Sequence, residues 1–132
     1  MGTRADFYIG IGKTAEWLGS IAYDGYRIEK MIEATAEKSD DYAACWAIKT
    51  ATTPEAFREG VARLLAVNDD ATTPEQGWPW PWDDSRTTDV SYAFTDGACK
   101  VFWWSEGAEW PDMSERKNVA YGHRSGLLII GG

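Results

Sequence analysis

Hydrophobic and polar residues alternate with a period of two near the start of the chain. Residues 6–11 place Phe7, Ile9 and Ile11 on one face, and residues 16–23 resume the alternation after a turn. Side chains two residues apart share a face of a strand, so both segments are predicted to be strands. The second strand is expected to carry on one face Trp17, Gly19, Ile21 and Tyr23. The chain therefore opens with a predicted β-hairpin.

A second hairpin is predicted after residue 89. Residues 90–95 and 98–104 alternate in the same way, and the pair Asp96-Gly97 lies between them. This pair is a strong turn signal, because both central positions of a type I′ turn need positive φ. Residues 127–130 predict a last short strand. In the strand at residues 90–95, one face is expected to carry Val90, Tyr92 and Phe94.

Between the hairpins the apolar residues recur with the period of a helix. Ile28, Met31, Ile32 and Thr35 follow the i, i+3, i+4, i+7 spacing of one helical face. Ser39 is a predicted N-cap for further helix. The stripe is then expected to continue through Tyr42, Cys45, Trp46 and Lys49. Between residues 27 and 50, one bent helix and two short helices both fit the pattern.

The next helix has the clearest boundaries. Thr53 is a cap candidate, and Pro54 stands at the first helical position, where its missing N–H costs nothing. The predicted buried stripe comprises Phe57, Val61, Leu64 and Leu65. Strands at both ends with helices between them predict an α+β fold, in which two or three helices cover one face of a mainly antiparallel sheet. At 132 residues, the chain is expected to form a single domain.

Composition narrows the class of protein. A hydrophobic content of 44% and a charged content of 26% are those of a globular chain. The sequence shows no apolar run long enough to span a membrane and no export leader, and Cys45 and Cys99 are more readily explained as reduced thiols than as a disulfide. We therefore expect a soluble cytoplasmic protein that does not bind membranes.

The formal net charge of -8 is unevenly distributed. The stretch from Asp69 to Asp89 holds six acidic residues and one arginine, which is over half of the net charge. Phosphate binding needs clustered Lys and Arg, so nucleic acid is not an expected direct partner. A basic protein partner is compatible with this charge. A solvated loop that aids solubility is an equally simple explanation.

The same stretch contains the block Trp78-Pro79-Trp80-Pro81-Trp82, followed by Asp83-Asp84. A residue before proline is restricted to extended conformations, so the block predicts a stiff, extended arm with three indoles. It lies in a long connection, residues 71–88, without a helical or strand period. Loops of this length are uncommon in compact domains unless they are functional or disordered. The indoles either plug an edge of the core or contact a partner.

The sequence predicts no catalytic residue and no cofactor. His123 is the only histidine and has no recognisable nucleophile partner, and residues 10–13 (Gly-Ile-Gly-Lys) lack the strand-to-helix context of a phosphate loop. No His/Cys cluster has zinc spacing, so no metal site is predicted. A hard cation remains a weaker alternative for Asp69, Asp70, Asp83, Asp84 and Asp89, although their spacing matches no calcium loop.

Three segments of the chain carry a resemblance to known proteins. They are GTRADFY (residues 2–8), EWLGSIAYDGY (residues 16–26) and DDATTPEQGWPWPWDDSRTTDVSYAF (residues 69–94). Together they resemble a family of small proteins of bacteriophages, prophages and their hosts, to which no named activity is attached. The resemblance implies a context and no catalytic residue: small acidic phage proteins are often non-catalytic binders of host machinery, including inhibitors of bacterial immunity.

Two hypotheses follow from these observations. The first is a non-catalytic binding protein, such as an inhibitor of a CRISPR effector, whose acidic, Trp-rich loop engages a basic, nucleic-acid-handling protein of a bacterial host. The alternative is a small enzyme or ligand-binding domain with an acidic pocket lined by Tyr92, Trp103 and Trp104. For the first hypothesis, the candidate partner-binding residues are Trp78, Trp80, Trp82, Asp83, Asp84, Arg86, Asp69 and Asp70.

Overall fold

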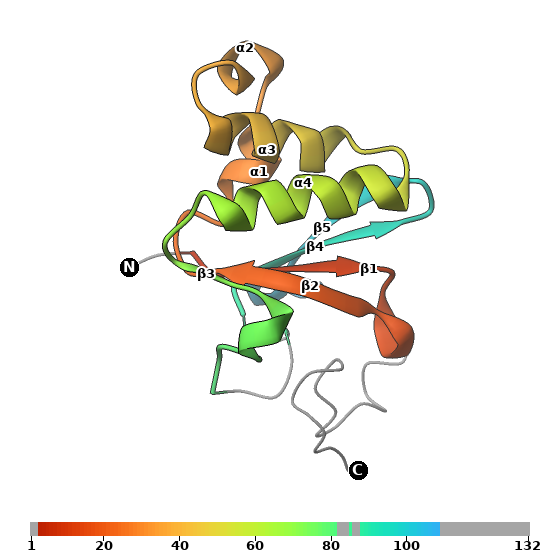
Figure 1. The fold of residues 1–132 in the computed structure, drawn as a ribbon. Helices are drawn as coiled ribbons and strands as arrows, with labels where there is room; N and C mark the ends of the chain where they lie inside the picture. Colours follow the sequence, from red (N-terminus) through yellow and green to blue (C-terminus); the bar gives the residue numbers. More distant parts are fainter. Residues whose placement is uncertain (1–2, 82–84, 86–87, 109–132) are drawn as a thin grey trace.

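The computed structural model describes residues 3–81, 85 and 88–108. Its strands form one mixed sheet in the order β3-β2-β1-β4-β5 (Figure 1). Neighbouring strands are antiparallel except β1 and β4, which are parallel. The predicted α+β class with a mainly antiparallel sheet is confirmed, whereas the last strand predicted at residues 127–130 lies outside the described part. The strand bounds are β1 Ala5–Ile9, β2 Glu16–Ile21, β3 Ala71–Thr72, β4 Val90–Thr95 and β5 Ala98–Trp103.

Helices cover one face of the sheet, as predicted. Helices α3 (Asp40–Thr50) and α4 (Pro54–Ala66) lie side by side over it (Figure 1). Both predicted caps are confirmed, because Ser39 Oγ accepts from the Tyr42 amide at 3.0 Å and Thr53 Oγ1 from the Ala56 amide at 3.1 Å. The stripe predicted for α4 is also buried: Phe57, Val61, Leu64 and Leu65.

The continuous helical stripe predicted for residues 28–35 is wrong. The chain forms two single-turn helices, α1 (Arg27–Lys30) and α2 (Glu33–Ala36), with Met31 and Ile32 extended between them. Ile32 is therefore 58% exposed, although its spacing predicted a buried position. Lys49 explains the break, because its Nζ donates to the carbonyl oxygens of Glu29 at 2.6 Å and Met31 at 2.8 Å and so terminates α1.

The buried face of α3 also differs from the predicted one. The helix buries Ala44, Cys45 and Ile48, whereas Tyr42 is 36% exposed. Of the predicted stripe only Cys45 is fully buried. Helix α4 packs closely along α3, since a Cβ added at Gly60 would lie 3.0 Å from Ile48 Cγ1 and 3.4 Å from Ala47 Cβ, and this packing overrides the pattern of larger side chains.

A β-bulge corrects the predicted first hairpin. Phe7 pairs with Gly19 but Tyr8 pairs with Trp17, so Leu18 is an extra residue in β2. The extra residue places Trp17 on the opposite face from Ile21, although strict alternation predicted one shared face. The second predicted hairpin is confirmed, since Asp96 and Gly97 both have positive φ, at 55° and 79°.

The second face of the sheet is covered too, within the described residues by loop segments and short 3-10 turns and by none of the α-helices. A separate apolar cluster there contains Tyr8, Trp17, Ala93 and Trp104. The segment that follows β3, with the short 3-10 helix η2 (Pro74–Gln76), runs below the sheet on the side away from α4 (Figure 1). The polar positions that alternate with core residues along β1, β2 and β4 are therefore buried and not solvated.

Candidate functional site

A row of polar side chains crosses the second face of the sheet. Ser20 on β2 and Ser91 on β4 are both direct neighbours of Asp6 on the central strand β1. All three residues are at most 1% exposed. A buried polar group destabilises the fold unless it is hydrogen-bonded. The side chains of this row therefore need hydrogen-bond partners from the segments that cover this face of the sheet.

Three indoles satisfy the row. Trp17 donates its Nε1–H to Ser20 Oγ at 3.0 Å, Trp80 to Asp6 Oδ1 at 2.7 Å and Trp104 to Ser91 Oγ at 2.8 Å. An indole combines a large apolar surface with a single donor, which suits a buried position beside a polar atom. Part of the high tryptophan content of the chain thus serves this face of the sheet.

Asp6 lies at the centre of a directed hydrogen-bond network. Its carboxylate accepts from Ser20 Oγ at 2.5 Å, Ser85 Oγ at 2.5 Å and the Trp80 indole. Tyr8 Oη lies 2.7 Å from Ser85 Oγ, whose proton is used toward Asp6, so the tyrosine is the donor. Burial raises the pKa of the Asp6 carboxyl above its ordinary value, and the hydrogen bonds oppose this shift.

This network anchors the Trp-Pro segment. Trp80 and Ser85 reach Asp6 from the loop, and the guanidinium of Arg4 lies 5.9 Å from the centre of the Trp80 ring. Trp78 packs edge-on against Trp17, with ring centres 5.1 Å apart. Trp78 and Trp80 therefore help to cover the sheet. The other loop candidates, Trp82, Asp83, Asp84 and Arg86, lie outside the described residues.

Asp69 and Asp70 belong to a different place, a polar hollow at the end of α4. The hollow has a volume of about 580 Å³ and is open to solvent. Asp70 accepts from the backbone amides of Ala22 and Tyr23 at 3.0 and 2.8 Å, so it fixes the chain after β2. Asp69 is exposed. The lining residues are Tyr23, Asp24, Arg27, Ser39, Asp41, Tyr42, Asn68, Asp69 and Asp70.

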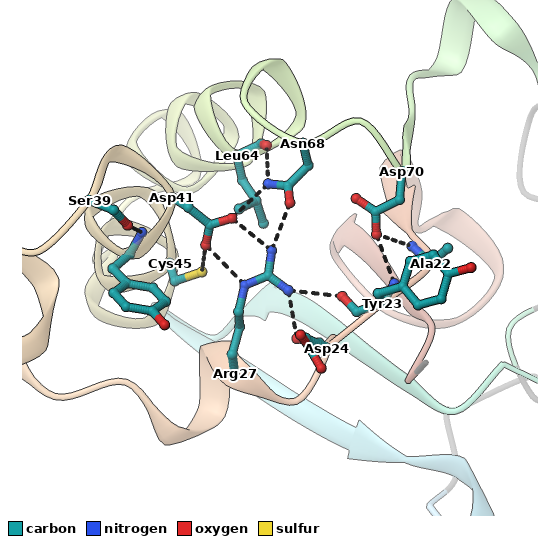
Figure 2. A network of polar contacts seen from close by, with 11 residues as sticks. Ala22, Tyr23, Asp24, Arg27, Ser39, Asp41, Cys45, Leu64, Asn68 and Asp70 are labelled. Carbon is teal, nitrogen blue, oxygen red and sulfur yellow. Dashed lines mark hydrogen bonds and ion pairs between the residues drawn. The ribbon is translucent and has the colours of Figure 1, made fainter. Parts of the chain in front are cut away.

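Arg27 lines this hollow and lies at the centre of its polar contacts (Figure 2). Its Nε and Nη2 donate to the two carboxylate oxygens of Asp41, both at 3.0 Å, and Nη2 also donates to Asn68 Oδ1 at 3.1 Å. Its Nη1 donates to the carbonyl oxygens of Tyr23 and Asp24 at 2.9 and 2.8 Å. These bonds use all five N–H donors of a guanidinium, so Arg27 is a clamp between α1, α3 and α4.

The clamp determines the electrostatics of the hollow. Burial alone raises the pKa of the Asp41 carboxyl, but the hydrogen bonds and charge of Arg27 outweigh it, so this pKa lies below its ordinary value. Asn68, which follows the end of α4, donates its Nδ2–H to the same carboxylate at 3.0 Å. With Arg27 neutralised by Asp41, the hollow is left with an excess of negative charge from Asp24, Asp69 and Asp70.

The rim of the hollow carries exposed aromatic surface. Tyr23 is 58% and Tyr42 is 36% exposed, and Asp24 is exposed beside them. Asp24 has a φ of 55°, a left-handed conformation that Asp tolerates better than most residues. The side chains of Tyr23, Asp24, Tyr42 and Asp69 together form what we call the acidic-aromatic rim.

The pocket predicted from Tyr92, Trp103 and Trp104 is not formed. Tyr92 belongs to the core under the helices and donates its hydroxyl to the Gly25 carbonyl oxygen at 2.6 Å, whereas Trp104 belongs to the cluster on the opposite face. The thiols of Cys45 and Cys99 are not activated either, because burial raises the pKa of each to about 12.

The described residues were compared with the side-chain groupings that hold metal ions in proteins. Within residues 3–81, 85 and 88–108, no three His, Cys, Asp or Glu side chains are grouped as metal ligands. Asp89, a candidate for a hard cation, instead accepts from the backbone amide and the guanidinium of Arg4, at 2.8 and 3.3 Å.

None of the described helices is long and apolar enough to cross a lipid bilayer.

Comparison of the chain with protein-family models, with curated proteins and with solved structures finds no match. The candidate site therefore depends on geometry alone. Sequence reasoning found Asp69 and Asp70 but missed Tyr23, Asp24 and Tyr42, because alternation and helical spacing assigned both tyrosines to buried faces. An available signal was the Asp24-Gly25 pair that ends the first hairpin, which marks a turn, and Asp24 in this turn is exposed.

Proposed function

We propose that this protein is a non-catalytic binding protein whose partner presents a basic surface to the acidic-aromatic rim. The observation that carries the proposal is the combination at one place of exposed Tyr23 and Tyr42 with the carboxylates of Asp24 and Asp69. Carboxylates steer and pair with Lys or Arg, and tyrosine rings stack on the same cations.

The internal bonding of the hollow supports binding over catalysis. The donors of Arg27 are occupied by Asp41, Asn68 and two backbone carbonyls, and Asp70 is held by two backbone amides. The five N–H donors of Arg27 are thus occupied within the fold, which leaves none for a substrate. The exposed side chains of the rim, in contrast, are available to a partner without disturbing the clamp.

The resemblance to phage and prophage proteins supports the class of partner that we propose. We propose a basic, nucleic-acid-handling protein of a bacterial host, such as a CRISPR effector, which an acidic protein would inhibit by occupying its nucleic-acid channel. The net charge of -8 would steer association with such a channel.

Affinity capture from a bacterial lysate tests this function. The immobilised baits are the wild type, an Asp24→Asn/Asp69→Asn variant and a Glu37→Gln/Glu59→Gln variant, and the lysate is treated with nuclease. The last variant removes the same charge from exposed positions on α4 and after α2. We expect the wild type and this control to retain a basic protein that the rim variant loses. Equal capture by all three baits would contradict the proposal.

A further inference from the structure

An apolar groove of about 410 Å³ lies on a different side of α4 from the clamp. Its walls come from β2, from α4 and from the turn at η2. Leu18, Val61 and Leu65 form an apolar floor, and the small residues Ala62 and Ala66 leave space above it. This volume lies within the range of sites that bind ligands or peptide segments.

The groove follows an edge of the sheet. Strand β2 extends over Glu16–Ile21, but β3 pairs only with Ser20 and Ile21. Beside Glu16–Gly19, no strand of the described chain adds to the sheet on this side. An edge of this kind is a template for another extended backbone.

The turn after β3 takes the described part of the chain away from this edge. The Thr73 amide donates to Gln76 Oε1 at 2.8 Å, which fixes the chain in η2 directly after β3. Pro74, at the first position of η2, has no N–H and so cannot donate a hydrogen bond to a neighbouring strand. The bulge at Leu18 twists the edge, so it suits a short segment and discourages the long pairing that leads to aggregation.

Charge indicates what kind of segment fits. Glu16 and Arg58 form an ion pair at the rim of the groove, with N···O distances of 2.7 and 2.9 Å, so Arg58 is neutralised. Glu75 stands exposed on the η2 side. The rim therefore keeps one uncompensated negative charge, that of Glu75, over an apolar floor. In a strand, alternate side chains point to opposite faces, so apolar residues two apart can enter the groove while a Lys or Arg meets the rim.

We infer that this groove binds a short extended peptide segment of a protein partner, with apolar residues at alternate positions and at least one basic residue, which adds a strand beside Glu16–Gly19. This surface is distinct from the acidic-aromatic rim, and the proposed function does not depend on it.

The test is a selection from a displayed library of random peptides of about ten residues, with the full chain as bait. Ala62→Trp fills the groove, and Ala56→Trp places the same side chain at an exposed position of α4 outside it. Both substitutions are at exposed positions, and thermal unfolding checks that each variant folds. Ala66→Trp is a second groove-filling variant.

The expected result is a shared motif of alternating apolar residues with Lys or Arg, whose affinity falls at least about tenfold in Ala62→Trp and is unchanged in Ala56→Trp. Bound peptide should slow hydrogen exchange at the amides of residues 16–19. Failure to enrich any motif, insensitivity to Ala62→Trp, or no added amide protection would overturn the inference. Binding of the dye 1-anilinonaphthalene-8-sulfonate in the groove without any selected peptide would also overturn it, in favour of a small apolar ligand.

Discussion

The indole Nε1 of Trp80 donates a hydrogen bond of 2.7 Å to the carboxylate of Asp6, 74 residues earlier in the chain. This bond joins the Trp-Pro segment to the central strand of the sheet. It makes at least one of the unusual tryptophans part of the fold, and it moves the search for a partner surface to the exposed rim at the end of α4.

Removing the Trp80 donor should destabilise the protein. Trp80→Phe keeps an aromatic ring but takes one hydrogen bond from a buried carboxylate, so we expect a loss of about 1.5–3 kcal/mol in the free energy of unfolding. Urea denaturation measures this loss. Trp46→Phe on α3, a half-buried position away from Asp6, is the matched control and should cost less. An equal cost in both variants would mean that the bond to Asp6 contributes little.

Asp6 should give the stability a recognisable pH dependence. Its pKa is raised in the folded state, so its contribution is fully present below the unfolded pKa of about 3.9 and is lost as the pH rises through the folded pKa. We therefore expect the difference in unfolding free energy between the wild type and Asp6→Asn to shrink as the pH rises from about 4. Denaturation of both proteins across this range measures it. A difference that grows with pH would show that the folded pKa is lowered.

The Arg27–Asp41 and Arg58–Glu16 pairs should contribute differently to the free energy of unfolding. The side chains of Arg27 and Asp41 are 15% and 27% exposed, so Arg27→Lys, which cannot form the same fork, should cost about 2–4 kcal/mol. The pair of Arg58 with Glu16 is about half exposed, and Arg58→Lys should cost less than about 1 kcal/mol. Chemical denaturation of both variants gives the comparison. Similar losses of unfolding free energy in the two variants would contradict a structural role for the Arg27 clamp.

Gly19 should tolerate no side chain. A Cβ there would lie 2.5 Å from Leu65 Cδ1 and 2.9 Å from the Thr72 carbonyl oxygen, and its φ is 143°. Gly97→Ala, with a φ of 79° and no neighbour near the added Cβ, isolates the backbone cost of about 1–2 kcal/mol. We expect Gly19→Ala to exceed this control by about 1–3 kcal/mol in urea denaturation. Equal losses would mean that α4 and β3 adjust around the methyl group.

Local signals predicted the elements whose causes are local. Thr53-Pro54 starts α4 and Asp96-Gly97 turns the second hairpin because caps and tight turns depend on a few adjacent residues. The break between α1 and α2 depends on Lys49, which is far along the chain, and the periodicity of residues 28–35 contains no trace of it.

The polar row on the second face of the sheet was harder to predict for a similar reason. Alternation assigned Asp6 to a polar face, and a polar face is normally solvated. The structure buries it because indoles from Trp17, Trp80 and Trp104 bring donors to the row that it forms with Ser20 and Ser91. Only the excess of tryptophan hinted at a second covered face.

The most direct test compares two matched pairs of carboxylates against the captured basic partner. Asp24→Asn/Asp69→Asn removes two charges from the rim, and Asp83→Asn/Asp84→Asn removes two from the Trp-Pro loop. The measurement is the dissociation constant at low and at physiological ionic strength. We predict that the rim variant weakens binding at least about tenfold and flattens its salt dependence, while the loop variant changes both little. The opposite result, with loss confined to the loop variant, would contradict the proposed surface and place recognition on the loop.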